Sequence, residues 1–306
     1  MTRSLTIGSR GSKLALTQSN FIADAIRALE PGLEVRVEII HTKGDKILDA
    51  PLAQIGGKGL FTKELEVALQ DARIDLAVHS LKDLPTELPE GLTLAAVPKR
   101  ESPYDAFVCS KWTSVDDLPA NARVGTSSLR RGAQLRAYRS DLEIVPIRGN
   151  VETRLRRVEE GAVDAAVLAC AGLNRLALGH AVLYALDVDV MIPAPAQGAL
   201  GIEARADDAK TLALLQRLTD SQTLAEVRAE RACLATLEGG CQVPLGALAR
   251  LNGGELELTA CVCTPDGEKV LRTTERGIAD EAESLGIQAA EALIANGAAA
   301  IIASVR

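Results

Sequence analysis

The pattern of apolar and polar positions predicts a chain that alternates between short strands and helices. An apolar run begins at Leu5, helical spacing follows from Leu14 to Leu29, and a second strand runs from Val35 to Ile40. The same order continues with a helix over residues 61–72, a strand from residue 74, and strands over residues 105–110, 142–147 and 163–169. Strands that alternate with helices are typical of α/β domains with largely parallel sheets.

The last third of the chain shows a different pattern. Three strand-like segments, near Leu245–Leu251, Glu255–Cys263 and Lys269–Gly277, are separated by glycine turns, and a helical pattern runs from Ala282 to Leu293. This pattern predicts a small α+β domain. Because 306 residues are many for one core, we predict three domains: residues 1–99 with 199–217, residues 104–193, and residues 221–306. The segment 193–203 is expected to cross back into the first domain.

Composition indicates an ordinary globular protein without a membrane segment. Hydrophobic residues make up 47% and charged residues 25%, the formal net charge is −7, and no run reaches the roughly 18 apolar residues of a membrane span. Basic residues interrupt the N-terminal segment, so we predict no signal peptide and a cytoplasmic protein. The six cysteines are then expected to be thiols. We predict no metal site, because Cys261-Val-Cys263 lacks a second Cys/His pair at zinc spacing.

Two strand ends in the first predicted domain carry side chains suited to an anionic ligand. Arg10 and Ser12 lie between the first strand and its helix, where free backbone N–H groups bind anions, although an ordinary capped turn explains them equally well. Ser80 and Lys82-Asp83 follow the strand from residue 74, at the edge where open α/β sheets bind ligands. A solvated ion pair is the alternative for Lys82-Asp83.

Three successive strand ends of the second predicted domain each present an arginine. Residues 122–157 hold nine arginines against three acidic residues, within a chain of net charge −7. This excess favours a small ligand with several carboxylates, because arginine binds carboxylates in a bidentate manner. The acidic total, the scarcity of aromatic residues and the absence of a DNA-binding motif argue against nucleic acid. The candidate residues are Thr126, Ser127, Ser128, Arg130, Arg131, Arg148, Arg154 and Arg175.

Two loops rich in glycine complete the candidate chemistry. Residues 41–60 lack periodicity, contain Lys58 and precede Phe61, and a mobile lid or binding loop is the usual explanation for such a segment. Cys241 follows a helical pattern and a Gly-Gly pair, and Pro244 prevents the helix from resuming. A thiol in such a turn has little cover, which favours an attachment or nucleophile role over the packing role usual for a free cysteine.

Six short motifs occur in order along the chain. They are Arg10-x-Ser-x-Leu-Ala-Leu16, Gly56-Gly-Lys-Gly-Leu-Phe61, Ala77-Val-His-Ser-Leu-Lys-Asp83, Val124-Gly-Thr-Ser-Ser-Leu-Arg-Arg131, Arg148-Gly-Asn-Val151 and Leu237-Glu-Gly-Gly-Cys-Gln-Val-Pro244. Together they resemble the porphobilinogen deaminase, or hydroxymethylbilane synthase, family of tetrapyrrole biosynthesis over essentially the whole chain. The resemblance implies two α/β domains similar to type II periplasmic binding proteins, with the active site in the cleft between them, and a small C-terminal α+β domain that carries the cofactor cysteine.

The resemblance also implies the chemistry. A dipyrromethane cofactor, built from the enzyme's own substrate, is held by a thioether to Cys241; four porphobilinogens are joined head to tail on it with loss of ammonia, and water releases hydroxymethylbilane. Family members work as soluble monomers, and the aspartate that matches Asp83 is catalytic. The resemblance assigns cofactor binding to Lys82, Arg130, Arg131 and Arg154 with hydroxyls of Ser80, Thr126, Ser127 and Ser128, substrate binding to Arg10, Ser12, Arg148 and Arg175, and the mobile loop to Lys58 and Phe61.

This chain departs from the family pattern at two positions. Ala196 stands before Gln197 where many relatives have glycine, which is expected to alter the crossing between domains slightly. Cys170 occupies a strand end where a less oxidisable small residue is expected. Neither position carries one of the assigned roles.

Two other functions are compatible with parts of the pattern. A solute-binding or effector-sensing protein would share the two-domain architecture, since fold alone does not determine function; it would be expected to carry a signal peptide or a DNA-binding domain. A hydrolase that uses Cys241 and His79 would need an orienting Asn or Asp and an oxyanion loop, and the sequence identifies neither.

Overall fold

The computed structural model describes residues 4–42, 44, 61–181, 184–237 and 243–305. By its internal contacts the chain divides into two compact units, residues 1–100 with 199–224 and residues 101–198 with 225–306. The division falls within helix α8 (Ser221–Thr236). Lys58, Cys241 and most of the glycine-rich segment predicted to be a lid lie outside the described residues.

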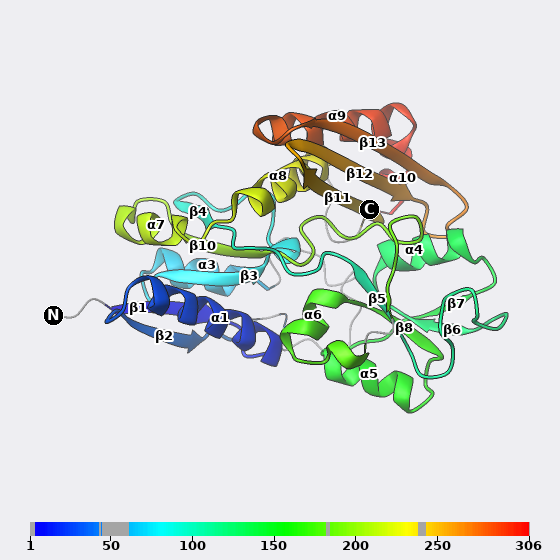
Figure 1. Cartoon of the computed structure of the whole chain (residues 1–306), viewed down its shortest axis with the longest axis horizontal. Coiled ribbons are helices and arrows are strands. Elements are labelled where there is room, and N and C mark those ends of the chain that lie inside the picture. The colour runs from blue at the N-terminus through cyan, green and yellow to red at the C-terminus, as the bar shows by residue number, and fades with distance from the viewer. Residues whose placement is uncertain (1–3, 43, 45–60, 182–183, 238–242, 306) are drawn as a thin grey trace. The chain divides into compact units, whose positions relative to one another are not determined.

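Among the described residues, a mixed sheet forms the centre of the first unit (Figure 1). Its strand order is β2-β1-β3-β10-β4, and β10 runs antiparallel to both of its neighbours. Side chains alternate along β3, so Leu76 and Val78 pack with α1 and α7 on one face while Ala77 packs with α3 on the other. The elements are β1 (Ser4–Ser9), α1 (Lys13–Leu29), β2 (Glu34–Ile39), α3 (Lys63–Gln70), β3 (Leu76–Ser80), a 3₁₀ turn (Leu81–Asp83), β4 (Leu92–Ala96), β10 (Leu200–Arg205) and α7 (Ala209–Gln216).

The second unit contains a mixed sheet of the order β7-β6-β8-β5-β9. Phe107 and Val167 pack with Leu135 of α4 on one face, whereas Val108 and Leu168 pack with α5 and α6 on the other. The elements are β5 (Asp105–Cys109), β6 (Arg123–Gly125), α4 (Leu129–Tyr138), β7 (Glu143–Val145), α5 (Val151–Glu159), β8 (Ala165–Ala169), α6 (Cys170–Arg175), a 3₁₀ turn (Gly179–Ala181) and β9 (Tyr184–Ala185).

These two sheets share one topology. In each, three parallel strands are followed by an antiparallel strand, β10 or β5, and then by an edge strand, β4 or β9. Since β10 pairs with β3 and β4, the chain after residue 193 returns to the first sheet. The sequence pattern and the resemblance both predicted two α/β domains, and the two sheets confirm that prediction.

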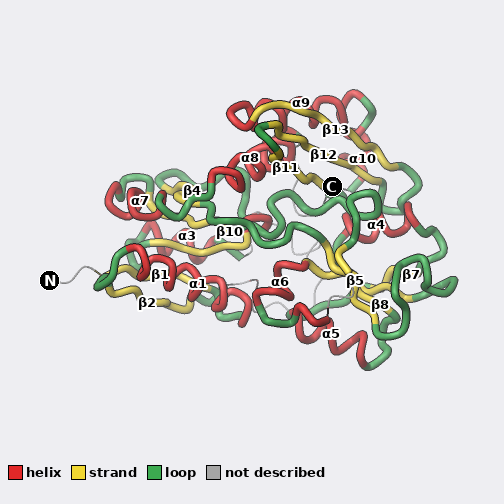
Figure 2. Tube along the Cα trace, viewed as in Figure 1, coloured by secondary structure: helices red, strands yellow, loops and turns green. Residues whose placement is uncertain are grey.

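A three-stranded antiparallel sheet with helices on one face completes the second unit, as Figure 2 shows in yellow and red. Its inner face packs Leu256 and Leu258 against Ala229 of α8 and Leu285 and Leu293 of α9. The opposite face contributes Leu248 and Cys261 to a small cluster with Ala133 of α4. The elements are β11 (Leu245–Asn252), β12 (Glu255–Cys263), β13 (Val270–Ile278), a 3₁₀ turn (Ala279–Glu281), α9 (Ala282–Ala295) and α10 (Ala298–Ser304). The predicted α+β domain is therefore present.

Carboxylates of α8 satisfy the outer edge of β11. Glu230 accepts hydrogen bonds from Ala249 N at 2.8 Å and from Ala196 N at 2.5 Å, and Glu226 accepts one from Leu251 N at 3.2 Å. Ala196 is buried with φ 60°, a left-handed conformation that glycine adopts more readily. The residue that departs from the family pattern here is thus a strained alanine, and the buried Glu230 carboxylate accepts a hydrogen bond from its backbone N–H.

No single described helix is long and apolar enough to cross a membrane. The residues 279–295 and 298–304 pass that length and composition test only as a pair, bent by 81°. Both of these helices contribute buried residues to the core of the three-stranded sheet.

Gly267 brings the β12–β13 turn against α4 and provides a test of this packing. A Cβ there would lie 2.6 Å from Ala137 N and 2.7 Å from Ala133 O, whereas a Cβ on Gly253 would meet nothing within 4 Å; both glycines have positive φ. We expect Gly253→Ala to lower the free energy of unfolding by about 1 kcal/mol, the cost of the left-handed backbone. Gly267→Ala should cost at least about 2 kcal/mol because the clash adds to it. Equal losses in urea titrations of the two variants would contradict this packing.

Candidate functional site

In the first unit, the end of β3 places Asp83 at the surface. Leu81 and Leu84 are buried on either side of the 3₁₀ turn that follows β3, and Leu81 N donates to Ala199 O at 3.0 Å. Asp83 is exposed, and Lys82 beside it is half-buried. Ser80 accepts a hydrogen bond from Gln18 Nε2 at 2.9 Å. The two buried leucines hold the turn, so the Asp83 carboxylate is presented on a fixed backbone rather than on a free loop.

His79 is committed to the interior of the first sheet. Its Nε2 lies 2.9 Å from Glu203 Oε2, and both side chains are buried. The other oxygen, Glu203 Oε1, is buried without a hydrogen-bond partner among the described residues. Burial also raises the pKa of nearby Glu66. A histidine held in this way is a poor candidate for the accessible base of a hydrolase, which weakens that alternative.

The loop between β1 and α1 forms the capped turn that was one of its two interpretations. Ser12 caps α1, since its Oγ accepts from Ala15 N at 3.3 Å, so the capped turn is present. The guanidinium carbon of Arg10 lies 4.0 Å from the centre of the Phe61 ring, a cation–π contact that orients this cation.

In the second unit, the predicted hydroxyl residues shape the start of α4. Ser128 caps the helix by accepting from Arg131 N at 3.4 Å, and Thr126 Oγ1 accepts from Ser128 N at 3.2 Å. Ser127 donates to Ile147 O at 2.7 Å. These bonds hold the strand-to-helix turn that carries the arginines of α4.

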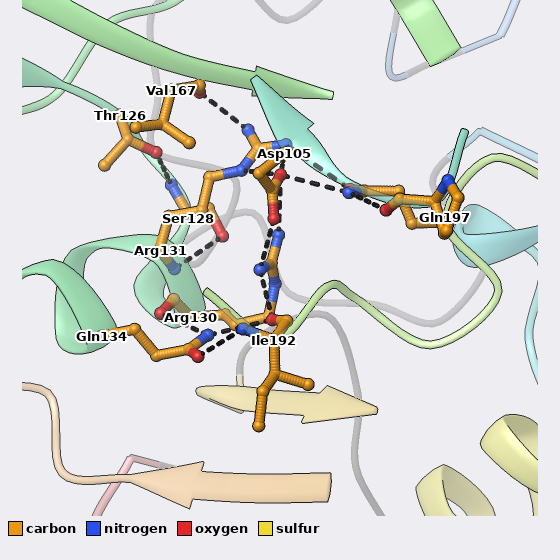
Figure 3. A network of polar contacts seen from close by, with 10 residues as sticks. Asp105, Thr126, Ser128, Arg130, Arg131, Gln134, Val167, Ile192 and Gln197 are labelled. Carbon is orange, nitrogen blue, oxygen red and sulfur yellow. Dashed lines mark hydrogen bonds and ion pairs between the residues drawn. The ribbon is translucent and has the colours of Figure 1, made fainter. Parts of the chain in front are cut away.

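Asp105, at the start of β5, lies between the guanidinium groups of Arg130 and Arg131 (Figure 3). Arg130 Nη1 donates to Asp105 Oδ2 at 2.8 Å, and Arg131 Nε donates to Oδ1 at 2.8 Å; Arg131 Nη2 also lies 2.7 Å from Oδ1. All three side chains are buried. Burial would raise the pKa of Asp105, but the two positive charges outweigh it and hold the pKa well below its usual range.

Amide and carbonyl groups satisfy other atoms of this network. Gln197 Nε2 donates to Asp105 Oδ1 at 3.1 Å, and Arg131 Nη1 donates to Val167 O at 3.1 Å. Gln134 binds both backbone groups of Ile192, accepting from N at 2.8 Å and donating to O at 3.0 Å. The arginines of α4 are thus attached to the segment 192–197 as well as to β5.

Arg148 and Arg154 differ from the arginines of α4 because, within the described residues, neither is paired with a carboxylate. Arg154 Nε donates to Gly149 O at 3.0 Å, and Gly149 has φ +103° at the turn into α5. Burial, with the charges of Arg131 and Arg148, lowers the pKa of Arg154 to about 10. One buried aspartate cannot balance four neighbouring arginines, so this end of the sheet is suited to an anion with several carboxylates.

A backbone carbonyl group orients the side chain of Arg175. Its Nη2 donates to Gly198 O at 2.7 Å, and burial lowers its pKa. Gly198 O also accepts from Glu101 N at 3.2 Å. Arg175 therefore helps to hold two chain segments together in the second unit, and this bond uses one of the five N–H groups of its guanidinium.

In the described parts of the chain, no group of three or more His, Cys, Asp or Glu side chains is placed to hold a metal ion. The excess of guanidinium groups fits an organic cofactor with carboxylate side chains, which Arg131 and Arg154 would hold.

Two family models match the chain. Residues 5–213 match the porphobilinogen deaminase dipyromethane cofactor binding domain, and residues 224–295 match the porphobilinogen deaminase C-terminal domain. A porphobilinogen deaminase of Desulforudis audaxviator is 53% identical over 306 residues, which cover 100% of this chain and 99% of that protein. The chain belongs to the porphobilinogen deaminase family.

Solved structures with more distant sequences also resemble the chain. The methionine-binding protein MetQ matches at a TM-score of 0.45 and 13% identity over 70% of this chain and 89% of that one. A putative methionine-binding lipoprotein of Bacillus subtilis matches at a TM-score of 0.44 and 13% identity, over 71% and 90%.

Several residues that shape the candidate site were not found from the sequence. Asp105 and Gln197 hold the arginines of α4, and Glu203 pairs with His79. An aspartate at the first position of an apolar strand, and a glutamate inside one, were the available signals, because an acidic residue in a buried strand needs a basic partner. The sequence did not indicate which basic residue would be that partner.

Replacing Asp105 tests the network. Asp105→Asn leaves two buried guanidinium groups without their acid, and removing one partner of a buried pair typically costs about 3–5 kcal/mol. We expect a loss of that order in the free energy of unfolding of the second unit, followed by urea titration with circular dichroism at pH 7. Asp141→Asn, which breaks the more exposed pair with Arg139, should cost much less. A neutral Asp105→Asn would contradict the network.

The same variant should change the response to acid. The pKa of Asp105 is lower in the folded chain than the roughly 3.9 of an unfolded aspartate. Its contribution is therefore complete above about pH 5 and is lost as the pH falls through 4 and below. Between pH 5 and 3 the unfolding free energy of the unaltered chain should fall more steeply than that of Asp105→Asn, and parallel slopes would contradict the assignment.

Proposed function

We propose that this chain joins four porphobilinogen molecules head to tail, with loss of ammonia, on a dipyrromethane primer and releases hydroxymethylbilane. The observation that carries the proposal is the cluster of Arg131, Arg148 and Arg154, in which burial and the charges of the other two arginines lower the pKa of Arg154. Porphobilinogen has one acetate and one propionate, so the growing product is a polycarboxylate. A cluster of guanidinium groups with little compensating acid would bind such a molecule strongly.

We assign the basic residues two tasks. Lys82, Arg130, Arg131 and Arg154 would hold cofactor carboxylates, and Arg10, Arg148 and Arg175 would hold the substrate or the elongating chain. The contacts of the described residues refine this division, because Arg130 and Arg131 already share Asp105 while Arg154 keeps most of its N–H groups for a ligand. Ser12, Ser80, Thr126, Ser127 and Ser128 would then act chiefly by holding the turns that carry these cations.

Asp83 is proposed as the catalytic residue. One carboxylate can hydrogen-bond to or protonate the leaving amine, stabilise the positive charge that develops on a pyrrole N–H, and accept the proton lost as aromaticity returns. Its exposure on a turn held by buried leucines supports this role. When bound, the dipyrromethane supplies the pyrrole carbon to which the first substrate is joined.

Cys241 is proposed as the point of covalent attachment, through a thioether. It lies in the part of the chain that matches the C-terminal family model. The flanking residues Leu237 and Val243 are buried in the core of the three-stranded sheet, so both ends of the intervening segment are anchored. Phe61 and Lys58 are proposed to belong to a loop that closes on the substrate.

We also propose a monomeric, cytoplasmic enzyme of three domains, residues 1–99 with 199–217, 104–193 and 221–306, without a nucleic-acid or membrane partner. Three sheets with separate apolar clusters support this division. The acidic net charge of −7 is unfavourable for binding nucleic acid. The full-length match to a porphobilinogen deaminase favours the enzyme over a solute-binding protein of similar architecture.

Covalent attachment of the cofactor to Cys241 is tested by mass spectrometry and by a colour reaction for pyrroles. The purified chain should show the mass increment of two pyrrole units and give a coloured product with an acidic aldehyde reagent for pyrroles. Cys241→Ala should lose both signals, whereas Cys109→Ala, which removes another thiol that is not fully buried, should keep them. An unmodified and colourless active protein, or two pyrrole units on Cys241→Ala, would reject the proposed attachment.

Catalysis is tested at Asp83. Asp83→Ala should keep the fold and the attached pyrroles but lower the rate of porphobilinogen consumption by at least about 100-fold, the lower end of what a general acid–base contributes. Asp24→Ala, which removes an exposed aspartate paired with Arg27, is the control and should retain the full rate. Near-normal turnover of Asp83→Ala would remove it from the mechanism.

A further inference from the structure

A hollow on the open face of the three-stranded sheet has the features of a second anion-binding site. Its volume is about 330 Å³, and its polar lining consists of Arg250, Arg272, Arg276, Glu257, Thr259 and Thr274. Val188 and Leu248 provide an apolar wall. The residues that line it all belong to the second unit, and none of them has a part in the proposed reaction.

The strand register explains why three arginines meet there. Arg250, Glu257 and Arg276 occupy one row across β11, β12 and β13, and Leu248, Thr259 and Thr274 occupy the next row on that face. Arg272 lies one row further, opposite Cys261. The arginines therefore flank the two threonine hydroxyls, whose Oγ1 atoms are 3.2 Å apart.

Arg250 is the lining arginine whose hydrogen-bond donors are not all satisfied. Its Nη2 donates to Tyr104 Oη at 2.9 Å, and its guanidinium carbon lies 5.6 Å from the centre of that ring. Its Nε is buried and has no hydrogen-bond partner among the described residues. The bond to Tyr104 uses one of the five N–H groups of this guanidinium, so its terminal nitrogens keep donors for an anion in the hollow.

The acidic side chains around the hollow form only weak ion pairs with its arginines. Arg276 pairs with Glu257 at 2.7 Å and, at 4.0 Å, with Glu255. Arg272 pairs at 3.2 Å with Asp189, whose side chain is 83% exposed. Exposed pairs of this kind contribute little and exchange readily. Arg250 itself has a tyrosine as its partner, so the lining keeps a positive charge for a ligand.

We propose that this hollow binds a small organic dicarboxylate. Paired guanidinium groups match carboxylates in geometry and charge, the threonines can donate to the same oxygens, and Val188 with Leu248 can contact a short carbon skeleton. The volume is at the small end of ligand pockets, which favours a molecule of a few carbons over a tetrapyrrole. This site is independent of the proposed polymerisation.

Calorimetric titration of the full chain with succinate, at constant ionic strength maintained with chloride, tests the site. We expect saturable binding, and Arg250→Gln should weaken it at least tenfold. Arg228→Gln, which removes an exposed arginine from α8, is matched in charge and should bind as the unaltered chain does. The binding should persist in Arg154→Gln, which separates it from the cluster proposed for the cofactor.

Further variants keep the test decisive. If Arg250→Gln does not fold, Thr259→Val should also weaken succinate binding without changing the rate of porphobilinogen consumption. Absence of saturable binding, equal affinity in Arg250→Gln and Arg228→Gln, or loss of binding in Arg154→Gln would overturn the proposal. Saturable binding of inorganic phosphate with none of succinate would overturn the carboxylate assignment.

Discussion

The second unit depends on one buried carboxylate between two buried guanidinium groups. Asp105 belongs to β5, Arg130 and Arg131 belong to α4, and the same arginines donate to backbone carbonyls of Ile192 and Val167. Four chain segments, namely β5, α4, β8 and the segment at Ile192, are therefore joined by these three side chains. Desolvating these charges is costly, and it is tolerated only because almost every polar atom in the network has a partner.

This arrangement separates two uses of arginine within one basic cluster. Asp105 neutralises part of the charge of the α4 arginines, and the fold holds these arginines in place. Arg154 of α5, in contrast, donates to a backbone carbonyl and has no carboxylate partner among the described residues. Burial, together with repulsion from Arg131 and Arg148, lowers the pKa of Arg154, and a bound polycarboxylate would relieve the repulsion. The folded chain is therefore prepared for an anion before one arrives, which reduces the rearrangement that binding requires.

Much of this could be predicted from the sequence, and the limits have physical causes. Alternation of apolar residues located Glu255–Cys263 as a strand with the bounds observed, and the spacing from Leu14 to Leu29 located α1. The strands β4 and β9 escaped notice, and the two residues of β9 are too few to show any periodicity. Asp83 became a candidate because polar residues follow a buried strand there. Asp105 was taken for part of an ordinary strand, since its partners lie 25 residues or more away in sequence and only the fold brings them together.

The topology shared by the two larger sheets shows where such hidden acids occur. In each sheet the antiparallel strand is the one contributed by a crossing segment, and in each that strand carries a buried carboxylate with a basic partner: Asp105 of β5 with the arginines of α4, and Glu203 of β10 with His79 of β3. His79 lies four positions before Asp83, and Arg131 neighbours the cations of the proposed cofactor site. Each pair can form only when the inserted strand is correctly placed, because either partner alone would be buried without compensation. In each unit the geometry of the adjoining strand end therefore depends on the inserted strand having joined the sheet.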